Sequence, residues 1–280
     1  METPPILREA GMPGVSVITL NRPERRNALN AALLETLCEA IDAVEQERSK
    51  RVLILRGAGD VFCAGLDLKE ALDEAAAERN ALLVLKTLRT IARSRLVTIA
   101  AVQGAAMAGG AGLMCACDFA IVADNARIGF PEVHRGLVAA LVMCFVARNV
   151  PGRHVRSLLM LGHPIDAKRA ESIGLINEAV APAQLDERAM RLAADLLTAA
   201  PFALEQTKRL LEQLSPWDLS EDLDAALRHH MQARASLEAR EGLQAFLEKR
   251  PPMWETFAAE ENMQSPVAPP LGGRRTGESL

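Results

Sequence analysis

Two segments of the sequence could present backbone N–H groups to a ligand. Residues 62–68 read FCAGLDL and follow an apolar run, so their small side chains would let a ligand approach the backbone. Residues 104–110 read GAAMAGG and lead into a predicted helix, whose first N–H groups have no helical partner. Two such donors that converge on one oxygen would form an oxyanion hole for an enolate or a tetrahedral anion. The structural alternative is that Gly109 and Gly110 only permit close helix packing.

Glu132 is the candidate acid or base. It follows Pro131, and apolar residues stand on both sides of it, at 128–130 and 137–138. Burial among them would raise the pKa of the carboxyl group and suit it to proton transfer near neutral pH. The structural alternative is an acidic residue in the first turn of a helix, where it complements the helix dipole.

His134 lies two residues after Glu132. If the chain is extended here, both side chains share a face, and the histidine could act as an auxiliary base. The alternative is a partly exposed histidine with no role in the chemistry.

Strands and helices alternate around these segments. Short β-branched or apolar runs predict strands, and Asn30 is followed by apolar residues at helical spacing. This order predicts an α/β fold with parallel strands and helical crossovers. The predicted strands are 15–20, 52–57, 98–102 and 119–123, with a small-residue stretch at 111–117.

Helical periodicity dominates after about Pro151. The last predicted helix stops before Pro251, because proline lacks the N–H donor that a helix needs. Residues 265–280 are rich in Pro and Gly, which predicts a mobile tail. The predicted helices are 167–173, 183–199, 203–214, 221–234 and 236–249.

Composition excludes several classes of protein. The 280 residues are 49% hydrophobic and carry a net charge of −4 with scattered basic residues and no Tyr, which argues against a nucleic-acid partner. No apolar run reaches the ~18 residues that a membrane span needs, so we expect a cytoplasmic protein without a membrane partner. The five cysteines form no zinc-binding pattern, and we expect reduced thiols and no metal site.

Several motifs together are similar to those of one enzyme family. In order along the chain they are NRPERRNALN (21–30), FCAGLDL (62–68), AVQGAAMAGGAGLMCACDFAIVA (101–123) and GFPEV (129–133), followed by IGLIN (173–177) and EGLQAFLEKR (241–250). The chain resembles the enoyl-CoA hydratase/isomerase (crotonase) family over roughly residues 6–254.

The resemblance implies a fold and an assembly. The expected fold is a crotonase-type spiral of repeated β-β-α units with a C-terminal helical region that builds trimers, which are commonly paired into hexamers. On this basis residues 1–200 form the spiral core with the CoA and oxyanion sites. Residues 201–264 form the helical region, and residues 265–280 form the disordered tail.

The resemblance also implies the roles of individual residues. The backbone N–H groups of Leu66 and Gly109 would hold the enolate of an acyl-CoA thioester, and Glu132 would be the acid/base. The second glutamate of the two-glutamate hydratases is replaced here by Gly112, and Ala140 stands where dienoyl-CoA isomerases place an Asp. The latter activity is therefore disfavoured.

Coenzyme A is expected only as part of the substrate, with no permanently bound cofactor. Its phosphates would meet basic residues, of which Lys249 would come from a neighbouring subunit; ordinary solvated surface is the alternative for each basic residue. The expected CoA- and substrate-binding residues are Arg25, Arg26, Ala28, Ala64, Asp67, Leu68, Gly110, Pro131 and Lys249.

These features predict an enoyl-CoA hydratase or lyase in fatty-acid or related acyl-CoA metabolism. Three alternatives stay open: an isomerase that shifts a double bond from position 3 to position 2, a thioester or C–C bond hydrolase with His134 or Asp67 orienting water, and a non-catalytic CoA-binding scaffold.

Overall fold

The computed structural model describes residues 4–67, 70, 76–215 and 218–254. Its larger sheet has six strands in the order β1-β2-β3-β4-β6-β9, and all neighbours are parallel except the antiparallel pair β1 and β2. The predicted parallel strands are confirmed, and β1 and β9 are additions. The bounds are β1 Ile6–Ala10, β2 Val15–Leu20, β3 Val52–Gly57, β4 Val97–Val102, β6 Phe119–Ala123 and β9 Glu178–Val180.

The smaller sheet has three short strands in the order β5-β7-β8. The chain passes from β4 to β5 to helix α4, and from β6 to β7 to helix α5, so a unit of strand, strand and helix repeats as predicted. An isolated bridge between Cys63 and Ala106 adds the 62–67 turn to the edge of this sheet. The bounds are β5 Ala105–Met107, β7 Arg127–Gly129 and β8 Ile165–Asp166.

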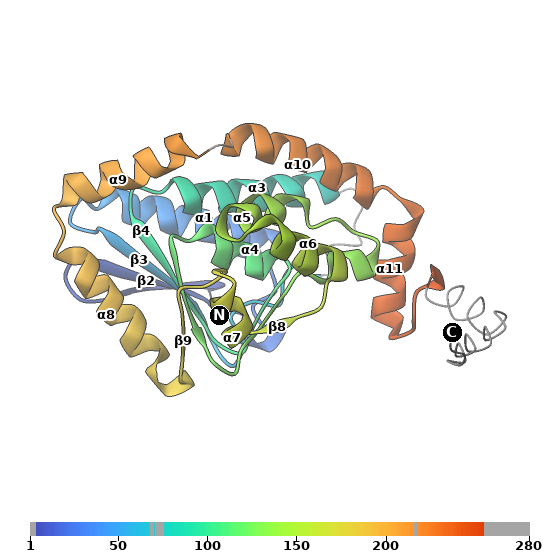
Figure 1. Ribbon diagram of the computed structural model, residues 1–280, viewed down its shortest axis with the longest axis horizontal. Helices are drawn as coiled ribbons and strands as arrows, with labels where there is room; N and C mark the ends of the chain where they lie inside the picture. Colours follow the sequence, from blue (N-terminus) through green and yellow to red (C-terminus); the bar gives the residue numbers. More distant parts are fainter. Residues whose placement is uncertain (1–3, 68–69, 71–75, 216–217, 255–280) are drawn as a thin grey trace, which may run out of the picture.

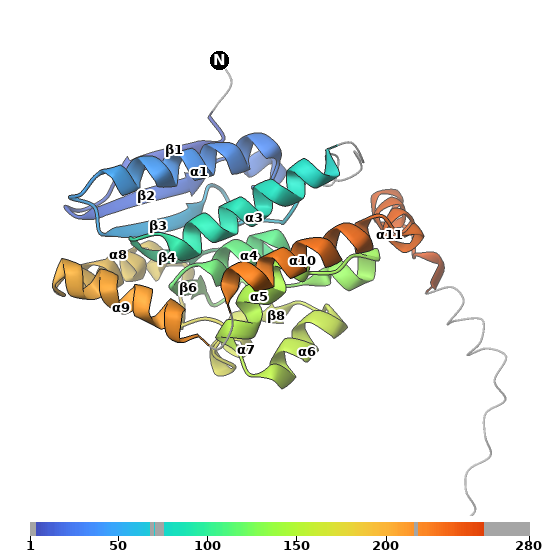
Figure 2. The ribbon, with the colours of Figure 1, turned by 90° about the horizontal axis from the view of Figure 1, so that it is seen from above.

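Helices cover both faces of the larger sheet. Figure 1 shows α1, α3, α4 and α5 on one face and α8 on the other, and Figure 2 shows α1 and α3 lying along the strands. Asn30 begins α1 as expected, because its side chain accepts a hydrogen bond from the Leu33 N–H at 3.0 Å. The bounds are α1 Ala31–Gln46, α3 Ala77–Arg93, α4 Gly109–Ala116, α5 Ala140–Asn149 and α8 Leu185–Leu197.

The second half is largely helical, as predicted. Helix α10 packs against α3 and α5 (Figure 2). Helix α11 packs against η2, the short 3₁₀ helix that carries Glu132. Among the described residues, α9 buries none of its side chains. The bounds are α6 Gly152–Leu161, α7 Ala167–Ser172, α9 Pro201–Leu214, α10 Leu219–Arg234, α11 Leu237–Glu248, η1 Pro23–Arg25, η2 Pro131–Arg135 and η3 Pro182–Gln184.

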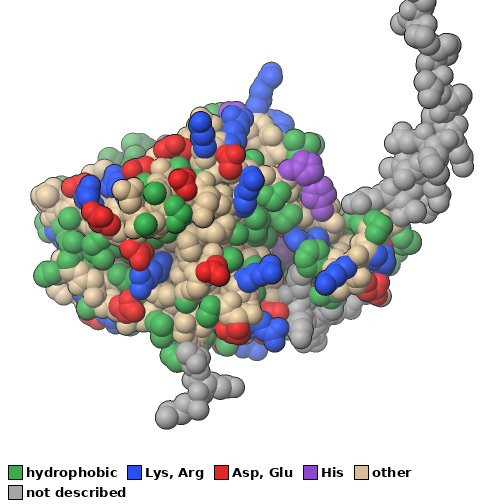
Figure 3. Space-filling view, turned by 90° about the horizontal axis from the view of Figure 1, so that it is seen from below, with side chains coloured by type: hydrophobic (Ala, Val, Ile, Leu, Met, Phe, Trp, Pro, Cys, Tyr) green, Lys and Arg blue, Asp and Glu red, His purple; other side chains and the backbone are tan. Residues whose placement is uncertain are grey.

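The surface charges, the cysteines and the helix lengths can be compared with the expectations from composition. Figure 3 shows Lys and Arg side chains mixed with Asp and Glu side chains over one face of the molecule. All five cysteines are free, and burial raises the pKa of Cys63, Cys115 and Cys117 to about 12. In the described part of the chain no helix is long and apolar enough to cross a membrane. The predicted tail at 265–280 lies outside the described residues, and the boundary at residue 200 stays a prediction.

Candidate active site

The fold brings the two N–H-bearing segments side by side. The Cys63 N–H donates to the Ala105 carbonyl at 3.1 Å, and the Met107 N–H donates to the Cys63 carbonyl at 3.0 Å. Gly110 sits directly against this turn, since a Cβ atom there would lie 2.5 Å from the Cys63 carbonyl oxygen. The glycine is therefore required for packing against the first segment, which in turn brings the two backbones together.

Leu66 and Gly109 each carry a backbone N–H group for which the described residues record no acceptor. On either side of Leu66, the Leu29 N–H donates to Gly65 and the Asp67 N–H donates to Leu29, both at 2.8 Å. Over the described ranges no hydrogen bond is recorded from the Leu66 N–H. Gly109 is the first residue of α4, where N–H groups lack helical acceptors. Both residues line the same pocket.

Glu132 lies in η2, immediately after Pro131 and the fully buried Phe130. Its Oε2 atom is buried and has no hydrogen-bond partner among the described residues. Burial raises the pKa of this carboxyl to about 7, against the lowering effects of a backbone N–H and of the nearby Arg135 guanidinium. The carboxyl group can therefore both release and accept a proton near neutral pH.

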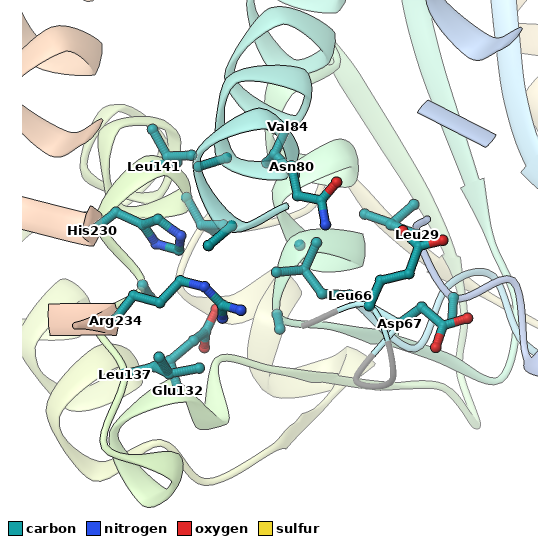
Figure 4. Close-up of a pocket in the computed structure, with 18 of the residues that line it drawn as sticks. Leu29, Leu66, Asp67, Asn80, Val84, Glu132, Leu137, Leu141, His230 and Arg234 are labelled. Carbon is teal, nitrogen blue, oxygen red and sulfur yellow. The ribbon is translucent and has the colours of Figure 1, made fainter. Parts of the chain in front are cut away.

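These groups meet in a cavity of about 300 Å³. In Figure 4, Glu132, His230 and Arg234 lie on one side of the cavity, Leu29 and Asp67 lie on the other, and Leu66 lies between them. Helix α3 contributes Ala77, Asn80, Ala81 and Val84, and α5 contributes the run 140–142. The wall on the Glu132 side is thus made of η2, α5 and α10.

The predicted CoA-binding residues are only partly gathered here. Arg25, Ala28, Ala64 and Asp67 line the cavity, and Asp67 forms an ion pair of 3.2 Å with Arg22.

Arg26, Gly110, Pro131 and Lys249 are outside the cavity lining, and Leu68 lies outside the described residues. The Arg26 carbonyl accepts a hydrogen bond of 3.0 Å from the Ala64 N–H, which ties the two segments together. Lys249 is exposed at the end of α11.

His134 is exposed and lies outside the cavity lining. Its Nε2 atom is 2.8 Å from the Leu161 carbonyl oxygen, and its ring stacks on His163 with centroids 5.4 Å apart. Both contacts direct the ring toward the loop after α6 and not toward Glu132.

Hydrocarbon fills the space beside Gly112, the position of the missing second carboxylate. A Cβ atom on Gly112 would lie 2.9 Å from Val142 Cγ2 and 3.5 Å from Leu88 Cδ2. A second acidic side chain therefore has no room here without a change in its neighbours.

The sequence did not reveal four polar or aromatic residues that reach the cavity. His230 and Arg234 are four residues apart on α10 and so share one face of that helix, which is a signal the sequence contains. Arg135 follows Glu132 by three residues in η2, and Phe246 comes from α11. Which elements meet at the cavity depends on tertiary packing.

Comparison with known proteins gives consistent matches. The family model for enoyl-CoA hydratase/isomerase matches residues 11–257. A putative enoyl-CoA hydratase of Thermus thermophilus is 37% identical over 243 residues, covering 85% of this chain and 96% of that protein. The mitochondrial enoyl-CoA hydratase domain-containing protein 3 of Homo sapiens is 31% identical over 244 residues, covering 86% and 80%. The crystal structure of an enoyl-CoA hydratase from Mycobacterium avium superposes with a TM-score of 0.82 at 32% identity, covering 90% of this chain and 100% of that one.

Proposed function

Because the chain belongs to the enoyl-CoA hydratase/isomerase (crotonase) family, we propose that it is an enoyl-CoA hydratase or lyase with Glu132 as its single acid/base. The observation that carries the proposal is that one cavity is lined by a buried carboxyl group, whose pKa is about 7, and by Leu66 and Gly109, whose backbone N–H groups have no recorded acceptor among the described residues. The family uses acyl-CoA thioesters as substrates, and coenzyme A enters only as part of them.

The proposed reaction adds water across the double bond of a 2-enoyl thioester. The Glu132 carboxylate takes a proton from a water molecule while the water oxygen forms a bond to C3. The electron pair of the double bond moves through C2 to the thioester oxygen, where the N–H groups of Leu66 and Gly109 stabilise the enolate. Protonated Glu132 then delivers its proton to C2, so the enzyme ends in its starting state.

An isomerase is the second candidate, and the surroundings of Gly112 favour it. A hydratase commonly shares its water between two carboxylates, but the position of the second one here is packed against Val142 and Leu88. An isomerase needs one carboxylate, which removes a proton from C2 of a 3-enoyl thioester and returns it to C4. Both reactions use the same enolate-type intermediate and the same two N–H donors.

We also propose that the chain forms trimers or paired trimers, with Lys249 reaching the CoA of a neighbouring subunit. The support is the apolar face of α9 formed by Leu210, Leu211 and Leu214, which are 52%, 67% and 71% exposed. Such an apolar helix face is typical of a protein interface. The cytoplasm stays our prediction for its compartment.

The test follows three signals with purified enzyme and a panel of acyl-CoA thioesters. A hydratase removes the absorbance of the 2-enoyl thioester, a 3-to-2 isomerase creates it, and a thioester hydrolase releases a free thiol. A chain that binds CoA thioesters but gives none of these signals would be a scaffold, which would refute the proposal.

The Glu132→Gln variant assigns the acid/base. We expect kcat to fall by roughly 10²-fold or more with little change in acyl-CoA affinity, because the amide keeps the shape but cannot carry the proton. Glu39→Gln, an exposed position on α1, is the matched control and should keep full activity. Near-normal turnover by Glu132→Gln would transfer the role to another group.

A further inference from the structure

Arg135 is a half-buried cation in the wall of the active-site cavity. Its Nε atom is buried and has no hydrogen-bond partner, and across the described residues no carboxylate lies within 4.0 Å of its guanidinium group. Burial lowers its pKa, and the charge of Glu132 only partly opposes this effect. Burying the Nε atom of a charged group without a hydrogen-bond acceptor is costly, so we expect a ligand to supply one.

The surrounding elements hold the guanidinium group in place. The Arg135 Cζ atom lies 4.3 Å from the centre of the Phe246 ring, which lines the same cavity. Stacking on a ring occupies the face of the guanidinium and leaves its edge N–H groups for an acceptor. The backbone is fixed as well, because a Cβ atom on Gly242 of α11 would lie 2.3 Å from the Arg135 carbonyl carbon.

Two further basic side chains approach the same part of the cavity. His230 and Arg234 project from α10 on the side where Glu132 lies (Figure 4). Burial, and then the charge of Arg234, lower the pKa of His230, while its hydrogen bond to Val138 opposes this. On the far side, Asp67 pairs with Arg22, and Glu70 accepts a hydrogen bond of 3.0 Å from the Ala31 N–H. The guanidinium groups of Arg135 and Arg234 therefore give the Glu132 side its positive charge, while the lowered pKa favours neutral His230; Arg25 is a further cation in the cavity lining.

The position of Arg135 in η2 indicates which part of the substrate could reach its guanidinium group. Residues i and i+3 of a 3₁₀ helix are eclipsed, so Arg135 projects from η2 on the same side as Glu132. In the proposed function Glu132 acts at the carbons next to the thioester, whereas the CoA phosphates lie beyond the whole pantetheine arm. An anion that reaches Arg135 would thus be carried by the acyl chain, a few atoms beyond C3.

We propose that this enzyme takes acyl-CoA substrates whose acyl chain ends in a carboxylate, and that Arg135 pairs with that carboxylate. This inference rests on the proposed function. It deepens the proposal by naming the substrate class, a short dicarboxylic acyl-CoA, and Arg135 as the residue that selects it. Arginine suits the role because its planar N–H edge matches the two carboxylate oxygens.

The first experiment uses the unmodified enzyme and two thioesters of nearly equal shape. 4-Carboxybut-2-enoyl-CoA carries the carboxylate, and 4-carbamoylbut-2-enoyl-CoA carries a neutral amide in its place. We expect kcat/KM to favour the acid by about 10- to 100-fold, which is the usual value of a hydrogen bond to a charged group. Equal values, or a preference for the amide, would overturn the substrate inference while leaving the proposed function intact. No turnover of any enoyl-CoA would instead refute the proposed function.

The second experiment uses Arg135→Met, which keeps the apolar stem of the side chain. We expect kcat/KM for the acid to fall to the value for the amide, with the amide itself changed less than about 3-fold. Arg228→Met, an exposed position on α10, is the matched control for the loss of one positive charge and should keep the preference. An equal loss on both thioesters would mean that Arg135 acts through Glu132 and would overturn the proposal.

A third arm separates the acyl carboxylate from the CoA phosphates as the anion. The same acid and amide are offered as pantetheine thioesters, which lack the nucleotide and its phosphates. We expect the preference for the acid, and its loss in Arg135→Met, to persist. An Arg135→Met effect that is seen only with full CoA thioesters would assign Arg135 to a phosphate and overturn the proposal.

Discussion

Replacing Glu132 with glutamine should stabilise the protein at alkaline pH while inactivating it. Burial raises the pKa of this carboxyl from an ordinary 4.5 to about 7 in the folded state. Below pH 4.5 the group is protonated in the folded and unfolded states, and its ionisation costs the fold nothing. Between about pH 4.5 and 7 the unfolded chain ionises while the folded chain stays largely protonated, so the fold loses stability across this window.

The size of the effect follows from the shift in pKa. One pKa unit corresponds to about 1.4 kcal/mol, so a shift from 4.5 to about 7 removes about 3 kcal/mol once Glu132 is fully ionised. Glutamine has no such charge. Between pH 5 and pH 8 the free energy of unfolding of Glu132→Gln should therefore rise relative to the unmodified protein by between about 2 and 3 kcal/mol.

Chemical denaturation of both proteins at pH 5 and pH 8 measures this difference. Protein concentration must be equal throughout, because assembly also contributes to apparent stability. Groups that titrate in both proteins cancel in the comparison, and Glu39→Gln should show no such pH dependence. A stability difference between Glu132→Gln and the unmodified protein that stays constant within about 0.5 kcal/mol across this range would refute the buried, raised-pKa carboxyl.

Two further predictions concern the missing carboxylate and the C-terminal helices. Gly112→Glu alone should destabilise the fold and add no hydration activity, because its Cβ atom would lie 2.9 Å from Val142 Cγ2. The double variant Gly112→Glu, Val142→Ala should raise the rate of hydration of a short 2-enoyl-CoA, measured as loss of the enoyl absorbance. No gain at any pH from about 5 to 9 would show that the cavity does not suit a second carboxylate. Truncation after residue 220 removes the rest of α10 and all of α11. It should abolish both assembly, measured by light scattering, and CoA binding, measured by titration. A full-length chain that binds CoA as a monomer would contradict the intersubunit role of Lys249.

Long elements with a strong local signal could be predicted from the sequence. Helix α1 is an example, since Asn30 caps it and its buried residues, among them Leu33, Leu37 and Ile41, follow helical spacing. Helix α3 has an equally clear buried stripe, with Val84, Leu88 and Ile91 at helical spacing, so its signal is present in the sequence although this helix is not among the predicted ones. Strands β5, β7 and β8 have three residues or fewer, which is too short for an alternating pattern to stand out.

The site shows the same division between local and tertiary information. The segments that carry Leu66, Gly109 and Glu132 have local features, namely small residues, a helix start and an apolar neighbourhood, and the three residues line one cavity. The wall that carries Arg135 and Arg234 depends on α11 packing on η2 and on α10 packing on α3 and α5, which are contacts between segments far apart in the sequence. No local sequence pattern around Arg135 or His230 predicts that these helices pack there.

The packing of α11 on η2 also determines when the catalytic turn is completed during synthesis. Cβ atoms on Gly136 and Gly242 would lie 2.3 Å from backbone atoms of the opposing segment, so the two backbones touch directly. Residues of η2 are translated long before those of α11, and the turn that carries Glu132 acquires its support only when α11 has left the ribosome. A nascent chain can thus complete its sheets and both N–H-bearing loops while Glu132 still lacks its final support. Under the proposed function, catalytic competence would therefore wait for α11 to fold.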